Sequence, residues 1–187
     1  MLWCLACLRP GQLAVCPDCA RTMGPGPWRR LSCGIGVSSA LVHRAAARRL
    51  VLRLKYGGCR ESAEVLAAVM SPLLPAGASA LAPVPRIYSR RLKYRSDPGL
   101  LLAGALSRRS GLPVCAVLGP RLQGGANAGL GRSDRIRPRF RRRWTPPKGL
   151  VLVDDVLTTG ATLTAAAATL GLSPVLGAVT ATASSHG

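Results

Sequence analysis

The sequence predicts an α/β protein in which helices flank a parallel sheet, with a small zinc-ribbon-like module in front of it. Three observations support this expectation. Apolar runs typical of strands alternate with amphipathic stretches typical of helices. Residues 151–163, VLVDDVLTTGATL, combine a buried strand with an acidic pair and a turn. Two closely spaced pairs of cysteines precede all of these segments.

The composition indicates a folded chain with an anionic partner. The 187 residues allow one ordinary domain plus a small appendage, and an apolar content of 48% with 18% charged residues excludes global disorder. The net charge of +19 arises from 26 basic and 7 acidic residues. Such an excess favours nucleic acid or phosphorylated ligands as partners.

Residues 1–27 are expected to form a zinc-binding module and its linker, and residues 28–187 the main domain. The spacing C-x2-C-x8-C-x2-C can supply four thiolates to one tetrahedral zinc, from Cys4, Cys7, Cys16 and Cys19. Four protein ligands leave no open position, so this zinc is expected to be structural. Redox-active thiols or disulfides are the alternative. The unpaired cysteines, Cys33, Cys59 and Cys115, are interpreted as small buried residues.

In the middle of the chain, segments with the helical spacing of apolar residues alternate with short apolar runs typical of strands. Helical spacing predicts a helix over 38–55, in which arginines form a solvated face and His43 is interpreted as an ordinary, partly exposed residue. A second helix is expected over 61–74, a strand over 80–85, a helix over 99–109 and a strand over 112–118. This order favours a parallel sheet with helices on both faces.

Residues 121–148 break the pattern and are interpreted as a mobile basic flap beside the ligand site. Six arginines fall between Arg135 and Arg143, and like charges repel one another unless an anion binds. Phe140 and Trp144 flank the arginines and could stack on bases. The predicted nucleic-acid contacts are Arg139, Arg141, Arg142 and Arg143. A solvated loop without a ligand is the alternative.

The segment 150–163 predicts a sugar-phosphate site. Leu150 to Val153 suit a central strand buried on both faces, which delivers Asp154 and Asp155 to the crevice at the carboxyl edge of a parallel sheet. Hydroxyls, backbone N–H groups and a helix N-terminus then suit a phosphate, at Thr158, Thr159, Gly160, Ala161 and Thr162. A plain strand-turn-helix is the alternative. A P-loop ATPase is disfavoured because GxxxxGK[ST] does not occur.

This segment resembles the signature loop of type I phosphoribosyltransferases, which bind phosphoribosyl pyrophosphate (PRPP). The resemblance implies a type I phosphoribosyltransferase-like parallel sheet. It also implies that Asp154 and Asp155 hold the ribose hydroxyls and that residues 158–162 hold the 5′-phosphate, with Mg²⁺ bridging ribose and pyrophosphate oxygens. By the same resemblance, Lys55 and the loop at 86–95, including Arg91 and Arg95, face the pyrophosphate. Asp154, Asp155 and Lys55 are the candidate catalytic residues.

Several motifs in order make the whole chain similar to the ComF family of competence-associated proteins. They are the cysteine pairs, LKYGG at 54–58, the PVP strand end with its arginines at 83–95, Gln123 with Arg132 and Phe140, and the segment 151–163. The family's RGFNQ is replaced here by residues 95–99, RSDPG, and Arg135 stands where an Asn is expected.

The ComF resemblance implies PRPP binding and a role in DNA uptake during natural transformation, with single-stranded DNA, a helicase partner and other DNA-uptake proteins. The alternative is an active phosphoribosyltransferase of nucleotide or related metabolism with an unknown acceptor. No residue in the sequence is an obvious base for that acceptor, so transferase activity stays open.

The protein is expected to be cytoplasmic, without a membrane span. Cys4 and Cys7 lie where a signal peptide needs its apolar region. The uncharged stretch 156–185 is better explained by a helix at about 160–170 and a strand at about 175–182, divided by Gly171, than by a single transmembrane helix.

Overall fold

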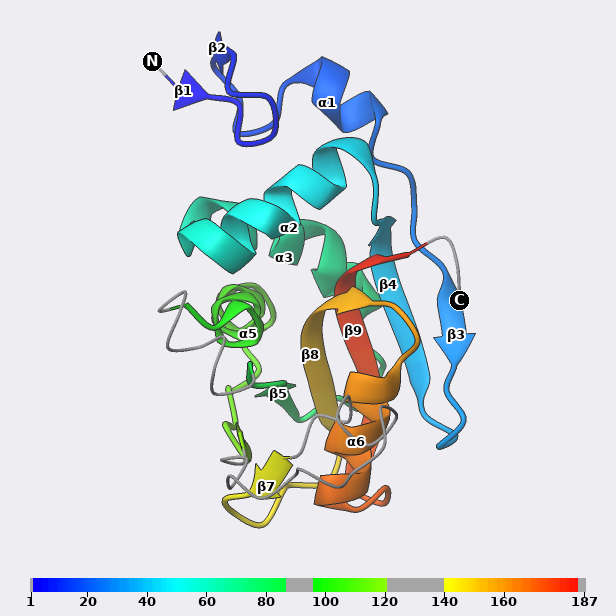
Figure 1. Ribbon diagram of the computed structural model, residues 1–187. Coiled ribbons are helices and arrows are strands. Elements are labelled where there is room, and N and C mark those ends of the chain that lie inside the picture. Colours follow the sequence, from blue (N-terminus) through cyan, green and yellow to red (C-terminus); the bar gives the residue numbers. More distant parts are fainter. Residues whose placement is uncertain (1, 87–95, 121–139, 185–187) are drawn as a thin grey trace, which may run out of the picture.

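A mostly parallel sheet forms the centre of the molecule. The computed structural model describes residues 2–86, 96–120 and 140–184 (Figure 1). Its five-stranded sheet has the order β3-β4-β9-β8-β5, with β3 (Trp28–Arg30) antiparallel to β4 (Gly36–Val42). The parallel members are β4, β9 (Val175–Ala183), β8 (Leu150–Leu157) and β5 (Ala80–Pro83). The predicted α/β class with a parallel sheet is confirmed.

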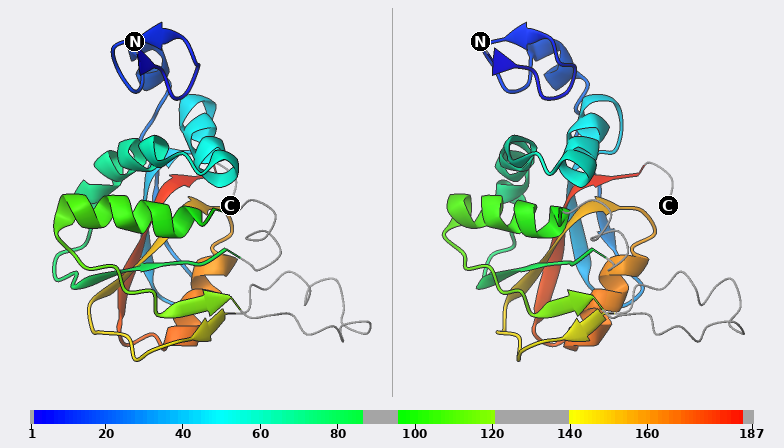
Figure 2. Two further views of the ribbon diagram at one scale, coloured as in Figure 1. Left: turned by 90° about the vertical axis from the view of Figure 1, so that its left-hand side faces the viewer. Right: turned by 60° about the vertical axis from the view of Figure 1, so that its left-hand side comes forward.

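Helices cover both faces of this sheet, as Figure 2 shows. On one face lie α2 (Ala45–Gly57), α3 (Arg60–Met70), the short helix η1 (Ser71–Leu73) and α5 (Pro98–Ser110). On the other lies α6 (Ala161–Leu170). Strand β8 alternates between two buried clusters, with Val151 and Val153 in the first and Leu150 and Leu152 in the second. Its unbroken apolar run therefore reflects burial on both faces.

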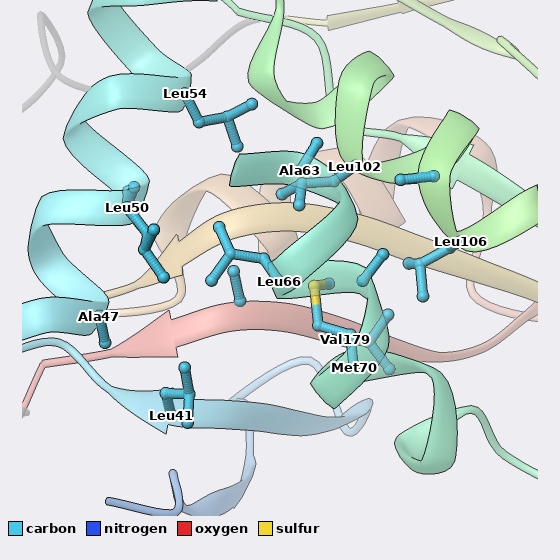
Figure 3. Close-up of a cluster of buried hydrophobic side chains, with 14 of the residues drawn as sticks. Leu41, Ala47, Leu50, Leu54, Ala63, Leu66, Met70, Leu102, Leu106 and Val179 are labelled. Atoms are coloured by element: carbon cyan, nitrogen blue, oxygen red, sulfur yellow. The ribbon is translucent and has the colours of Figure 1, made fainter. Parts of the chain in front are cut away.

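The first cluster is the larger core and consists mostly of leucine and alanine (Figure 3). Leu50 and Leu54 from α2 meet Leu66 from α3 and Leu106 from α5 over the sheet. All four leucine side chains are fully buried. Helical spacing of these apolar positions gives each helix one buried stripe, and its other side carries the exposed arginines.

The cysteine-rich module packs on the end of this core rather than standing apart. It contains β1 (Leu2–Trp3), β2 (Pro10–Gly11) and α1 (Pro17–Arg21), and α1 lies against α2. The hydroxyl of Thr22 accepts a hydrogen bond from the backbone N–H of Ala46, in the first turn of α2. The predicted linker runs along β4, where Gly26 N–H donates to the Ala40 carbonyl at 3.0 Å. The domain division after residue 27 stays a prediction.

Three expectations about local structure were wrong in part. Residues 38–42 belong to strand β4 and not to the predicted helix, because their burial alternates with a period of two and they pair on both sides. Residues 112–118 form one bridge, Val114 to Leu81, before the short β6 (Leu118–Pro120). Residues 140–142 of the predicted flap form β7 (Phe140–Arg142), paired with β6. The flap's residues 121–139 lie outside the described residues.

The strand order makes the chain diverge at one edge of the sheet. Strands β5 and β8 are neighbours, and their carboxyl ends lead to α5 and α6, which cover opposite faces. In open α/β sheets, ligands bind outside the carboxyl ends of strands at such a divergence. Of the helices among the described residues, none is long and apolar enough to span a membrane.

Two glycines of α5 provide a test of how closely this helix approaches the ends of β5 and β8. A Cβ at Gly99 would lie 2.5 Å from the Val84 carbonyl oxygen, whereas a Cβ at Gly104 would meet nothing closer than Arg108 Nη1, at 3.8 Å. We expect Gly99→Ala to lower the free energy of unfolding by ~1–3 kcal/mol through overpacking. Gly104→Ala should raise it by ~0.5–1 kcal/mol through helix propensity. Chemical denaturation of both variants checks this, and equal effects would contradict the packing.

Candidate functional site

The acidic pair lies inside strand β8, past the point where one neighbouring strand ends. Pairing with β5 stops at Val153, whereas pairing with β9 continues to Leu157. The sequence placed the strand end at Val153, but the ladder with β9 extends it by four residues. Asp155 is 9% exposed, and its backbone N–H donates to Asp154 Oδ1 at 2.9 Å. Both acids therefore lie at the carboxyl edge of the sheet. At this level β5 has already ended, and β8 is paired only with β9.

The turn after β8 has the features of a phosphate cradle. Thr158 and Thr159 are exposed, and Gly160 adopts φ +80°, a left-handed conformation that L-residues with side chains disfavour. Helix α6 starts at Ala161, whose N–H donates to Thr159 Oγ1 at 3.4 Å. Thr162 lies in the first turn, where backbone N–H groups lack acceptors within the helix. The positive end of the helix dipole adds to these donors.

Lys55 joins the acidic pair from the last turn of α2. Its Nζ lies 3.1 Å from Asp155 Oδ1, and the two side chains are 25% and 12% exposed. The Lys55 carbonyl accepts hydrogen bonds from Arg86 Nη1 at 2.7 Å and from Ser96 Oγ at 3.1 Å. These bonds tie the end of α2 to the segments that follow β5 and precede α5. A lysine 100 residues earlier in the chain is thereby fixed beside the acids.

The electrostatics of the site are unusual at Asp154. Burial raises its pKa to about 8, and the negative charges of Asp155 and, to a smaller extent, Asp97 raise it too. The Asp155 backbone N–H and Lys55 oppose this rise. A carboxyl group with a pKa near 8 carries a proton at neutral pH in the ligand-free protein. Asp154 therefore offers an O–H donor where Asp155 meets a lysine.

Three neighbours of this site were not assigned to it by the sequence analysis, which interpreted His43 as an ordinary, partly exposed residue. His43 follows β4, and its pKa is lowered by burial and then by Lys55 and Arg48, while Asp155 opposes the shift. Asp97 caps α5 by accepting from Leu100 N–H at 3.3 Å. Arg29 of β3 donates to the Ser184 carbonyl at 3.0 Å and to that of Thr158 at 3.5 Å, which anchors the turn. The sequence held no signal for these three residues, because the strand that ends before His43 was predicted as part of a helix.

Two of the predicted pyrophosphate contacts, Arg91 and Arg95, lie outside the described residues. Arg86, from the start of the same loop, is placed. It lies over the ring of Tyr56, 5.8 Å from its centroid, and bonds the end of α2. Arg86 therefore supports Lys55 structurally.

The described part of the predicted basic surface lies on β7 and the two residues that follow it. Arg141, Arg142 and Arg143 are exposed and line a shallow pocket together with Trp144, which is 66% exposed. Phe140 is 6% exposed and packs in the cluster under α6, so it cannot stack on a base as expected. Gly119 leaves space on the facing strand for the side chains of Arg141 and Arg143. Arg139 lies outside the described residues.

The four N-terminal cysteines meet as the spacing predicted. The sulfur atoms of Cys4, Cys7, Cys16 and Cys19 all lie within 4.8 Å of one another. The Cys7 and Cys16 sulfurs are 3.8 Å apart. A tetrahedral zinc with Zn–S bonds of about 2.3 Å holds its sulfurs about 3.8 Å apart. The donor set and its spacing thus fit a structural zinc ion.

Hydrogen bonding prepares this cluster for a cation. Although burial opposes it, N–H groups of Cys16, Cys7 and Ala6 lower the pKa of Cys4 to about 6. Burial, followed by contacts with the other three thiols, raises the pKa of Cys19 to about 12. Without a cation the cluster therefore holds protons on part of its thiols. A bound zinc replaces those protons, so its affinity must rise with pH.

Comparisons with known proteins found similarity among solved structures. No protein-family model matches the chain, and no curated protein matches it in sequence. The chain is similar to orotate phosphoribosyltransferase from Aeropyrum pernix, with 23% identity over 83% of this chain and 72% of that chain and a TM-score of 0.41. It is also similar to adenine phosphoribosyltransferase from Leishmania donovani, with 14% identity, 82% and 73% coverage and a TM-score of 0.41. The function proposed below rests on the site itself.

Zinc content provides a test of the cysteine cluster. We expect the purified chain to hold one zinc, and Cys16→Ser to hold none, whereas the matched variant Cys115→Ser keeps it. Zinc should be released as the pH falls, because protons compete for the thiolates. Elemental analysis after dialysis at a series of pH values measures both effects. Equal zinc content in the two variants would contradict the assignment.

The pKa of Asp154 predicts a pH-dependent stability. The folded protein binds this proton more tightly than the unfolded chain does. Below pH 4 the carboxyl group is protonated in both states and costs no folding free energy. As the pH rises towards 8, the unfolded chain loses the proton first, so the free energy of unfolding falls. Asp154→Asn removes the penalty. The variant should gain on the order of 3 kcal/mol at pH 9 and nothing at pH 4. Denaturant melts at both pH values measure this, and a gain independent of pH would refute the cause.

Proposed function

We propose that the protein binds PRPP at the carboxyl edge of its sheet. One observation carries the proposal: an acidic pair, a helix start rich in hydroxyl and N–H donors, and a lysine meet at the divergence of β5 and β8. A chain with a net charge of +19 and 7 acidic residues has few acids for a ligand site, and two of them lie side by side here. A sugar phosphate uses each of these groups.

The roles follow from the chemistry of each group. Asp155, a carboxylate acceptor, and Asp154, which carries a proton in the free protein, suit the hydroxyls of a ribose. Thr158 to Thr162 present donors to the 5′-phosphate. Lys55 faces the same carboxyl edge and supplies positive charge for the pyrophosphate.

Lys55 has a second role in the ligand-free protein. Its ammonium group lies 3.1 Å from Asp155 and neutralises a carboxylate that is largely removed from water. A ribose hydroxyl replaces this contact when the sugar binds, which releases Lys55 towards the incoming negative charge. Asp155 then accepts a hydrogen bond from the sugar, and Lys55 pairs with the negative charge of the ligand.

Magnesium fits as part of the ligand. Within the described residues, the cysteine cluster is the sole group of three or more metal-ligating side chains whose donor atoms converge. Mg²⁺ is held mainly by substrate phosphates and waters in sites of this kind. Mg²⁺ would arrive with PRPP, and the residues of this chain would bind the sugar and balance the charge.

Two uses of bound PRPP are proposed. The first follows the ComF resemblance: a PRPP-responsive protein of DNA uptake that handles single-stranded DNA beside a helicase. The exposed Arg141, Arg142, Arg143 and Trp144 support it, since they combine phosphate-binding cations with one stacking surface. The second is phosphoribosyl transfer to an acceptor. Lys55 supports it, because charge on the departing pyrophosphate must be neutralised where the anomeric carbon becomes cationic.

PRPP binding can be tested by calorimetry with Mg²⁺. Removing an acid makes this basic protein more positive, which by itself should strengthen its binding to any anion. Weaker PRPP binding in Asp155→Ala would therefore indicate that Asp155 contacts the sugar directly. We expect at least a tenfold loss of affinity, equal to about 1.4 kcal/mol. The control Asp18→Ala removes an exposed acid from the cysteine module, where Asp18 pairs with Arg21, and should bind normally.

Ligand fragments separate the two halves of the site in the same experiment. Thr162→Val should weaken ribose 5-phosphate and leave pyrophosphate unaffected, while Lys55→Met should do the reverse. The site assignment fails if Thr162→Val and Lys55→Met bind each fragment with the same affinity. It also fails if Asp155→Ala binds PRPP as tightly as the unaltered chain does.

DNA binding is tested by salt dependence. Each phosphate contact on single-stranded DNA contributes about 0.7 to the slope of log K against log salt, so Arg141, Arg142 and Arg143 replaced together by Ser should reduce it by about 2. Arg9, Arg60 and Arg109, all exposed elsewhere, replaced in the same way form the charge-matched control. Trp144→Ala should weaken binding without changing the slope. Equal slopes in the two triple variants would exclude this surface.

A further inference from the structure

His43 links the ends of three neighbouring parallel strands at the carboxyl edge. It directly follows β4, and its backbone N–H donates to the Ala183 carbonyl, at the end of β9, at 2.7 Å. Its Nδ1 lies 2.8 Å from Thr182 Oγ1. The Thr182 hydroxyl in turn donates to the Asp155 carbonyl on β8, at 3.3 Å. These bonds hold the ring at the carboxyl ends of β9 and β8, where it is joined through Thr182 to the backbone of Asp155.

We assign the tautomer of His43 from this chain of bonds, in which the Thr182 hydroxyl lies 2.8 Å from His43 Nδ1 and 3.3 Å from the Asp155 carbonyl. A threonine hydroxyl has a single hydrogen, and Thr182 gives it to the Asp155 carbonyl. With its hydrogen assigned to that carbonyl, Thr182 Oγ1 accepts from His43, and this assignment gives Nδ1 the hydrogen. In the neutral imidazole this leaves a lone pair on Nε2. In the parts of the chain that the structure describes, Nε2 forms no hydrogen bond, and it remains available to a ligand.

The surroundings of the imidazole disfavour its charged form. Apart from burial, the charges that act on it are Lys55 and Arg48 of α2, which lower its pKa, and Asp155 of β8, which raises it. Thr182, its partner on β9, does not titrate. Through Thr182 the ring is joined to the backbone of Asp155, the residue to which the proposed function assigns the ribose.

We propose that His43 is the proton acceptor for the nucleophile in phosphoribosyl transfer, with Nε2 as the accepting atom. The inference rests on the proposed function and adds the class of acceptor: a compound that attacks through a nitrogen or oxygen bearing a hydrogen, such as a heterocyclic N–H. The bond from that atom to the anomeric carbon forms while the carbon–oxygen bond to pyrophosphate breaks. The electron pair leaves with pyrophosphate, and the hydrogen moves to Nε2 and then to water.

Binding of PRPP prepares His43 for this step. In the free protein Lys55 and Arg48 disfavour the imidazolium. The negative charges of bound PRPP offset these cations, so the pKa of His43 rises when the site is filled, and the base is strengthened only when substrate is present. A general base is most effective when its pKa is near the working pH.

Nitrogen NMR of the full chain labelled with ¹⁵N-histidine tests the arrangement directly. The chain has two histidines, His43 and His186, and loss of one signal in His43→Asn assigns them. The expected signal of His43 is that of the Nδ1–H form. Thr182→Ser should preserve it, whereas Thr182→Val, which lacks the hydroxyl, should populate the Nε2–H form. A dominant Nε2–H form in the unaltered chain overturns the inference even if PRPP binds.

Saturation with Mg²⁺ and PRPP should then raise the pKa of His43, and an unchanged titration overturns the inference. In a pyrophosphate-release assay with nucleobase acceptors, His43→Asn should lower the rate about 10²-fold, leave the KM for PRPP unchanged and remove the acid limb of the pH profile. Normal turnover in His43→Asn, or PRPP binding without any pyrophosphate release, also overturns it. A chain that binds no PRPP overturns the proposed function itself.

Discussion

The parallel direction of four strands is the constraint on which the site depends. Because β4, β9, β8 and β5 run the same way, the chain leaves all of them at one edge. His43 and Asp155 reach that edge from strands more than a hundred residues apart in sequence. The helices after β5 and β8 then turn to opposite faces, so the backbone diverges where the acids stand.

The polar groups at this edge are arranged at the expense of stability. Asp154 is held where its charge is disfavoured, and Asp155 is largely buried against Lys55. Neither arrangement favours folding over well-packed apolar residues of the same size. Proteins retain such groups where a ligand uses them, which is the common conflict between stability and activity. The leucine- and alanine-rich core shown in Figure 3 offsets this cost.

Helix α2 connects the two chemically distinct parts of the molecule. Its first turn receives the Thr22 hydroxyl from the cysteine module, and Cys4 and Cys19 join the same core as its buried leucines. Its last turn carries Lys55. The cysteine module therefore supports the helix that positions the lysine, and its Thr22 contacts that helix at the end opposite to Lys55. Figure 1 shows α1 and α2 side by side. A structural zinc fits this arrangement, since a five-residue helix such as α1 is too short to be stable alone.

The sequence by itself determined the features that are local. Spacing identified the four cysteines, and the run from Leu150 to Thr162 identified a strand, two acids and a helix start, because each depends on neighbouring residues. Only the tertiary structure decided that residues 38–42 pair as a strand, that Phe140 is buried and that Lys55 meets Asp155. His43 gained its partners in the same way, through Thr182, 139 residues away. Such contacts depend on strand order and register, which arise from packing of the whole chain and leave no periodic trace in a single segment.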